Sequence, residues 1–79
     1  MQHLILKIQP NDAYRICIYQ TEHGYKVNSQ VKKSKEWRRS DNDATFPDDY
    51  QGAINAIKTA GSMLVQYIDK KGKSYDSAV

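Results

Sequence analysis

The length, composition and charge of this chain exclude several classes of protein. It has 79 residues, a net charge of +3 and one cysteine, Cys17. This length fits one domain, and 39% hydrophobic with 27% charged residues excludes an intrinsically disordered chain. A single cysteine excludes an internal disulfide, and the start MQHLILKIQP lacks the basic region and apolar length of a signal peptide or membrane span. We therefore expect a cytoplasmic protein without a membrane partner.

Three segments have the composition of β-strands. Residues 4–8 (LILKI), 14–20 (YRICIYQ) and 24–32 (GYKVNSQVK) are rich in β-branched and aromatic residues, and QPNDA and TEHG separate them as loops. The third segment alternates with the period of two that is typical of a half-buried strand. A fourth strand around KEWRRS would complete an antiparallel meander.

From FPDDYQ onward the apolar residues recur every three or four positions, which predicts a helix. Asp48 is its expected N-cap, with Gln51 as the capping-box partner, and Gly72 is expected to follow its last turn. The predicted fold class is α+β: an antiparallel sheet of three to four strands, packed on one face by a single long C-terminal helix. Residues 1–72 would form this domain and residues 73–79 a flexible tail.

Two apolar stripes run along the predicted helix. The first contains Tyr50, Ile54, Ile57, Gly61, Leu64 and Ile68, and the second contains Ala53, Ala56, Ala60, Met63 and Tyr67. Two interpretations remain open: the helix lies deep across the sheet with both stripes, or part of this surface pairs with a second copy. Because a domain of this size buries only about 60% of its unfolded surface, a second copy would add stability. The residues predicted for that dimer interface are Ala56, Ala60, Met63 and Tyr67.

The loop lengths predict which strand residues pair. A four-residue TEHG loop pairs Gln20 with Tyr25 and Ile18 with Val27, and a five-residue QPNDA loop pairs Leu6 with Ile16. Both choices place the same residues on the face that the helix should cover: Leu4, Leu6, Ile8, Ile16, Ile18, Val27 and Val31. The opposite face would meet water or a partner, and it carries Ile5, Lys7, Arg15, Cys17, Tyr19, Lys26, Asn28, Gln30 and Lys32.

The position of Trp37 depends on the turn that follows Val31. A turn with an even number of residues pairs Gln30 with Trp37 and places the ring on the basic face, whereas an odd number pairs Val31 with Trp37 and places the ring in the core. Neither glycine nor asparagine is present in VKKSKEW to supply positive φ, so a four-residue turn is favoured over a two-residue turn.

Charge is segregated along the chain. Residues 15–39 carry seven basic side chains against two acids, and residues 41–49 carry four acids and no base. This pattern is typical of a phosphate-binding surface, although lysines also protect exposed sheet edges from aggregation. The residues predicted to bind nucleic acid are Arg15, Tyr19, Lys26, Asn28, Lys32, Lys33, Lys35, Trp37, Arg38 and Arg39.

No motif for catalysis or for a cofactor stands out. The acidic stretch DNDATFPDD lacks the central glycine and distal glutamate of a calcium loop. Cys17, His3 and His23 do not have the spacing of a zinc site, and a mid-strand Cys17 is badly placed to pair with His23 as a nucleophile. We expect neither an enzyme nor a bound metal.

The order of three or four antiparallel strands and one long helix resembles the single-stranded nucleic-acid-binding fold of the Whirly family and the positive-cofactor-four coactivators. This resemblance implies dimerisation through helices and binding of strands across a basic, aromatic-bearing sheet. The succession of GYKVNSQVKKSKEWRRS and ATFPDDYQGAINAIKTAG is also similar to the three-stranded DNA-binding domains of tyrosine-integrase arms and plant ethylene-response factors. That second resemblance implies a sheet that enters the major groove.

The leading hypothesis is a small, dimeric, non-enzymatic nucleic-acid-binding protein. The basic residues would neutralise phosphates while Tyr19 and Trp37 stack on bases, which favours single strands because their bases are exposed. A protein-interaction module is the alternative, such as a phage-encoded inhibitor of a host defence complex or an antitoxin-like partner, with the same face meeting an acidic protein. A structural subunit whose basic strands are merely solvated is the third interpretation.

Overall fold

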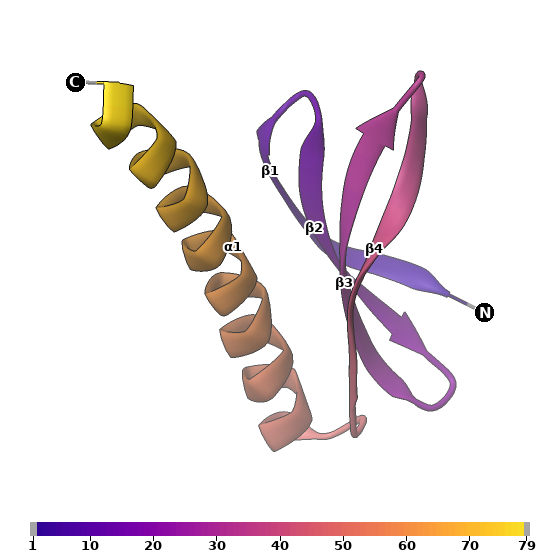
Figure 1. The fold of residues 1–79 in the computed structure, drawn as a ribbon. Helices are drawn as coiled ribbons and strands as arrows, with labels where there is room; N and C mark the ends of the chain where they lie inside the picture. Colours follow the sequence, from indigo (N-terminus) through magenta and orange to yellow (C-terminus); the bar gives the residue numbers. More distant parts are fainter. Residues whose placement is uncertain (1, 79) are drawn as a thin grey trace.

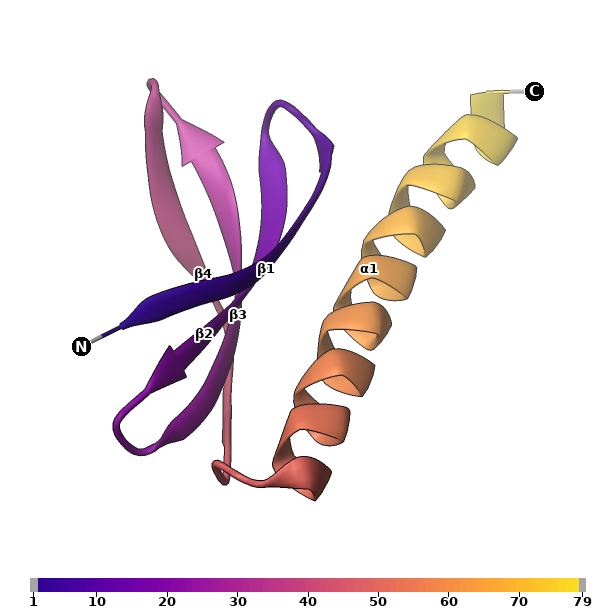
Figure 2. The same ribbon diagram turned by 180° about the vertical axis from the view of Figure 1, so that it is seen from behind.

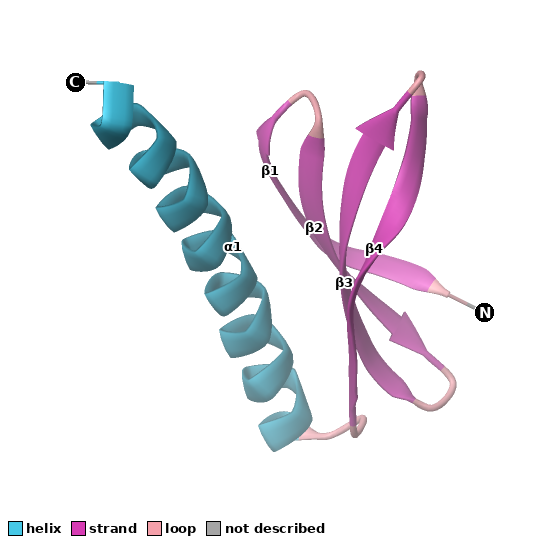
Figure 3. Ribbon diagram, in the orientation of Figure 1, coloured by secondary structure: helices cyan, strands magenta, loops and turns pink. Residues whose placement is uncertain are grey.

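Four antiparallel strands in sequential order form one sheet, and a single long helix lies along one side of it (Figures 1 and 3). The computed structural model describes the backbone of residues 2–78 and the side chains of residues 2–39 and 43–70. The elements are β1 (His3–Asn11), β2 (Tyr14–Thr21), β3 (Gly24–Lys33), β4 (Glu36–Phe46) and α1 (Tyr50–Ala78). The predicted α+β meander with one C-terminal helix is confirmed.

The register of the central hairpin agrees with the prediction, whereas that of the first hairpin does not. β2 pairs with β3 through Ile18 opposite Val27, as expected. In the first hairpin Ile8 lies opposite Ile16, two residues away from the predicted pairing. The reason is the turn: Asn11 Oδ1 accepts a hydrogen bond of 2.7 Å from the Ala13 amide, which closes a two-residue connection in place of the predicted five-residue loop. A shift of two residues keeps each side chain on its predicted face.

An irregularity in β1 reverses two side chains. Leu4 lies opposite Tyr19 and Leu6 lies opposite Ile18, so Ile5 is an extra residue on the β1 side of the ladder. Ile5 consequently lines a hollow on the helix side together with Leu6, and Leu4 is paired with a residue of the opposite face. The prediction that Leu4 faces the helix and Ile5 faces away is therefore wrong.

The core forms between the sheet and the second of the two helix stripes. Ile16, Ile18 and Val27 pack against the helix and are at most 3% exposed. The helix residues in this core are Ala56, Ala60 and Met63. Their short or flexible side chains let the helix approach the large branched residues of the sheet closely. A ring stack extends this contact toward the C-terminal half of the helix, because Tyr14 and Tyr67 lie 4.0 Å apart with nearly parallel planes.

Most of the first stripe points away from the core. Its members Tyr50, Ile57 and Ile68 are between 53% and 82% exposed, and the neighbouring Val65 is 57% exposed. The predicted dimer interface of Ala56, Ala60, Met63 and Tyr67 is therefore wrong as an exposed surface, because these residues already pack within one chain. The alternative in which both stripes lie on the sheet holds only in part: Leu64 of the first stripe packs against the core, whereas Tyr50, Ile57 and Ile68 are exposed.

Tyr14 is the titratable group that this packing perturbs. Burial raises the pKa of Tyr14 above 10.0, the nearby Tyr67 hydroxyl adds to the rise, and a hydrogen bond with Ser29 partly opposes it. Tyr67 is also tied to β1 through a hydrogen bond from the Asn11 amide group. These contacts anchor the helix beside the β1–β2 turn.

Both ends of the helix differ from the prediction. Asp49, and not Asp48, is the N-cap: its Oδ1 accepts a hydrogen bond of 2.7 Å from the Gly52 amide, three residues later. Asp48 Oδ1 instead accepts a hydrogen bond of 3.4 Å from the side-chain amide of Gln20. At the other end α1 continues through residues 73–78, which were predicted as a tail, although their side chains lie outside the described residues.

The helix accounts for the elongated shape of the molecule. Its 29 residues span about 43 Å, close to the longest dimension of 46 Å. Seen from behind in Figure 2, α1 starts beside the end of β4 and runs past the β1–β2 turn. Within the described residues, no helix has both the length and the apolar character needed to cross a membrane.

Candidate nucleic-acid interface

A two-residue turn joins β3 to β4 and decides where Trp37 lies. Ser34 and Lys35 form this turn with positive φ angles of 52° and 70°, and Lys32 lies opposite Trp37. The predicted preference for a four-residue turn is wrong: the twist of a tight hairpin selects two positive-φ residues, at a cost of about 1–2 kcal/mol each when they are not glycine. The turn is nevertheless even, so Trp37 lies on the side away from the helix.

The Trp37 ring is half-buried and is covered by cations. The guanidinium carbon of Arg15 lies 4.1 Å from the ring centroid, and Lys32 Nζ lies 5.9 Å from it. Three strands thus supply one cation–π cluster, with Arg15 from β2, Lys32 from β3 and Trp37 from β4. The ring is neither a core residue nor a bare platform, because the Arg15 guanidinium already lies over it.

A hydrogen-bond network centred on Gln30 holds Arg15 in place. Arg15 Nε donates to Gln30 Oε1 at 2.7 Å. The amide nitrogen of Gln30 donates to the Tyr19 hydroxyl at 3.1 Å and to Asn28 Oδ1 at 3.0 Å. Gln30 Oε1 accepts its hydrogen bond from the charged Arg15 guanidinium, and the two bonds that the Gln30 nitrogen donates fix the plane of its amide. This network therefore holds Arg15 over Trp37 without a ligand.

The centre of this face is buried, which corrects part of the prediction. Asn28 is 4% exposed, Gln30 is 9% exposed and Cys17 is 1% exposed. Asn28 was predicted to contact nucleic acid, but at this exposure it serves as an acceptor for Gln30 and cannot reach a ligand. Gln30 was not among the predicted site residues, although its position two residues from Asn28 on the same strand face could have indicated a shared role.

The predicted basic residues divide between the two sides of the hairpin. Lys32 and Arg39 lie on the side of Trp37, since Arg39 pairs with Gln30 in the β3–β4 register. Arg39 also forms an ion pair of 3.3 Å with Asp43. Lys33 and Arg38 point to the other side, where Arg38 lies 3.8 Å from Glu36.

Two further predicted residues lie apart from these four. Lys35 is in the turn itself. Lys26 is on the Trp37 side but at the other end of β3, opposite Thr45. We define the Trp37 face as the following residues: Arg15, Tyr19, Lys26, Gln30, Lys32, Trp37 and Arg39. The structure therefore assembles only part of the predicted site into one surface.

The described residues contain no group of three or more histidine, cysteine, aspartate or glutamate side chains that could hold a metal ion. No family model matches the chain, and neither a curated protein nor a solved structure matches it.

Proposed function

We propose that this protein binds single-stranded nucleic acid, without catalysis, through the Trp37 face, which includes one side of the basic β3–β4 hairpin. One observation carries the proposal: the only tryptophan of the chain lies beside Arg15 and Lys32 on one side of a strongly basic hairpin. Residues 32–39 contain five basic residues and one acid, a net charge of +4. Phosphates supply most of the affinity at such a surface, and their binding releases counterions.

The geometry favours exposed bases over a duplex. The Arg15 guanidinium carbon lies 4.1 Å from the centre of the Trp37 ring, and a guanidinium can stack on a base as an aromatic side chain does. The bond to Gln30 uses only the Nε donor among the five N–H groups that a guanidinium carries. Arg15 can therefore keep its place on Trp37 while its terminal nitrogens approach a phosphate or a base edge.

The two sides of the hairpin provide a matched test. Lys32→Ala with Arg39→Ala removes two positive charges from the Trp37 face, and Lys33→Ala with Arg38→Ala removes two from the other side of the same hairpin. Binding of a fluorescein-labelled oligonucleotide is measured over a series of salt concentrations. We expect the first variant to lower the slope of log affinity against log salt by about 1.4, at roughly 0.7 per phosphate contact. The second variant should lower it by much less.

Trp37 provides an independent measurement. Because the chain contains one tryptophan, its intrinsic fluorescence reports on this face alone. We expect oligonucleotide binding to quench it, and Trp37→Leu to weaken binding by about 5- to 150-fold, the equivalent of one stacked base. Thermal unfolding of the variant checks that the fold is retained.

The outcomes separate the proposal from its alternatives. Equal losses for the two double variants would mean that the hairpin attracts phosphates without using the Trp37 face. Failure of single-stranded and duplex oligonucleotides to bind at physiological salt would contradict nucleic-acid binding and leave an acidic protein surface as the ligand for these basic residues.

A further inference from the structure

The helix α1 carries an apolar surface that the chain itself does not cover. Tyr50, Ile57, Val65 and Ile68 are 82%, 60%, 57% and 53% exposed. At 100° per residue they fall within one sector of the helix, about 60° or more away from the core residues Ala56 and Ala60. The remaining sector of the helix is polar, so α1 has a core side, a solvent side and an uncovered apolar side.

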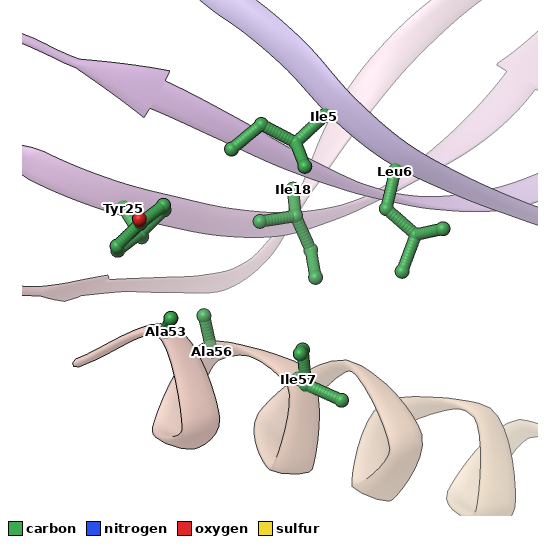
Figure 4. A pocket seen from close by; sticks show the side chains of 7 residues that line it. All are labelled: Ile5, Leu6, Ile18, Tyr25, Ala53, Ala56 and Ile57. Carbon is green, nitrogen blue, oxygen red and sulfur yellow. The ribbon is translucent and has the colours of Figure 1, made fainter. Parts of the chain in front are cut away.

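This apolar side continues onto the sheet. Figure 4 shows Ile57 of α1 across a hollow from Ile5 and Leu6 of β1. The hollow has a volume of about 270 Å³, and Ile5 and Leu6 are 48% and 41% exposed. Within the described residues, no Cα atom of β1 approaches one of α1 within 8 Å, so the two elements leave their apolar side chains open between them.

The size of this surface indicates that it has a partner. Six large side chains, each between 41% and 82% exposed, present on the order of 500 Å² of apolar surface, near the upper end of what a monomer leaves in one patch. Two such patches with their polar margins reach roughly the 1,200 Å² at which specific interfaces begin. A second copy therefore supplies a partner of sufficient area.

The order of residues along the stripe is symmetric about Gly61. Ile57 and Val65 lie four positions on either side of it, and Ile54 and Ile68 lie seven positions on either side. In a two-fold dimer, if one residue of the first copy contacts a different residue of the second copy, the same contact also occurs with the two copies exchanged. Two antiparallel helices with Gly61 on the axis satisfy this requirement, because Ile57 then meets Val65 of the second copy and Ile54 meets Ile68.

No contact among the described residues explains the glycine at position 61. An added Cβ at Gly24 would overlap the Phe46 carbonyl oxygen and one at Gly52 the Pro47 carbonyl oxygen, whereas one at Gly61 meets no described atom within 4 Å. Glycine in the middle of a helix is unfavourable unless something must approach closely. We propose that two copies of this chain associate through this stripe, with their α1 helices antiparallel and crossing at Gly61.

Cross-linking tests the crossing point. With helix axes about 8–10 Å apart and Cα atoms about 2.3 Å from each axis, facing Cα atoms lie roughly 3.5–5.5 Å apart, which overlaps the range for a disulfide. We expect Gly61→Cys to form a covalent dimer under mild oxidation and Ser62→Cys, on the exposed polar side, to remain largely uncross-linked. Cys17 is 1% exposed and too buried to compete. Equal cross-linking at both positions would overturn the proposed crossing.

Sedimentation equilibrium without nucleic acid tests the association itself. We expect the chain of 9.1 kDa to sediment as a dimer at micromolar concentration. Val65→Glu places two unpaired carboxylates in the interface and should weaken the dimer at least about 100-fold, whereas Ser62→Glu adds the same charge outside it and should leave the dimer intact. Circular dichroism confirms that both variants are folded. A folded monomer for the unmodified chain, or a dimer that tolerates Val65→Glu, would overturn the proposal.

Discussion

Replacing Gln30 by methionine would remove the centre of the network that holds the Trp37 face. The two side chains have similar length and volume, so the substitution deletes hydrogen bonds with little change in packing. Gln30 is 9% exposed and bonds to Arg15, Tyr19 and Asn28. Each of these partners loses a bond, and the loss at Asn28 matters most because it is 4% exposed and gains little from water.

The magnitude follows from the three bonds. A hydrogen bond to a charged group contributes about 1.5–3 kcal/mol and a neutral one about 0.5–1.5 kcal/mol. Water compensates the half-buried Arg15 and Tyr19 in part, so we expect a net loss of about 3 kcal/mol in the free energy of unfolding. For a domain of this size, about 1 kcal/mol shifts Tm by roughly 4–8 °C, so Tm should fall by more than about 10 °C.

Thermal unfolding followed by circular dichroism measures this effect, with Gln51→Met as the matched control. Gln51 is exposed and donates one bond of 3.3 Å to Asn55, which contributes about 0.2–0.5 kcal/mol. The fluorescence of Trp37 should also change in Gln30→Met before any unfolding, because Arg15 is released from the ring. Equal stability of the two variants would refute the reasoning, since the network would then contribute nothing beyond an exposed helix pair.

Two further predictions concern the packing of the helix. Because burial raises the pKa of Tyr14 above 10.0, the folded chain keeps the Tyr14 proton to a higher pH than the unfolded chain. The contribution of this group to the free energy of unfolding is therefore fully present below about pH 10 and is lost as the pH rises through the raised pKa. Urea unfolding from about pH 8 to pH 11 should show a shallower decline for Tyr14→Phe than for the unmodified chain, and an equal decline would contradict the assignment. Gly52→Ala should destabilise the chain by about 1–3 kcal/mol despite the better helix propensity of alanine, because the added Cβ would overlap the Pro47 carbonyl oxygen. The effect of Gly61→Ala is measured in the Val65→Glu variant, in which the proposed dimer is weakened. There Gly61→Ala should raise the free energy of unfolding by up to about 1 kcal/mol, since its Cβ meets no described atom within 4 Å. A loss at Gly61 as large as that at Gly52 would contradict both assignments.

Local pattern was sufficient for the order of elements, but it left open the side of the sheet on which Trp37 lies. The pairing of Ile18 with Val27 followed from the loop between two well-marked strands, and it agrees with the structure. The side of Trp37 depended only on whether the β3–β4 turn is odd or even, since side chains alternate along a strand. The length of that turn could not be predicted, because Ser34 and Lys35 adopt positive φ without a glycine or asparagine.

Only the tertiary structure decided which helix stripe is covered and which part of the basic face is exposed. A period of 3.6 residues identifies two apolar stripes but not which of them lies on the sheet. Close packing against Ile16 and Val27 selected the stripe with the small residues Ala56 and Ala60, and left Tyr50, Ile57 and Ile68 of the other stripe exposed. Likewise, alternation placed Asn28 beside Arg15 and Trp37 on one face, but its burial arises from contacts among strands that are distant in sequence. Periodicity depends on neighbours along the chain, whereas burial depends on neighbours in space.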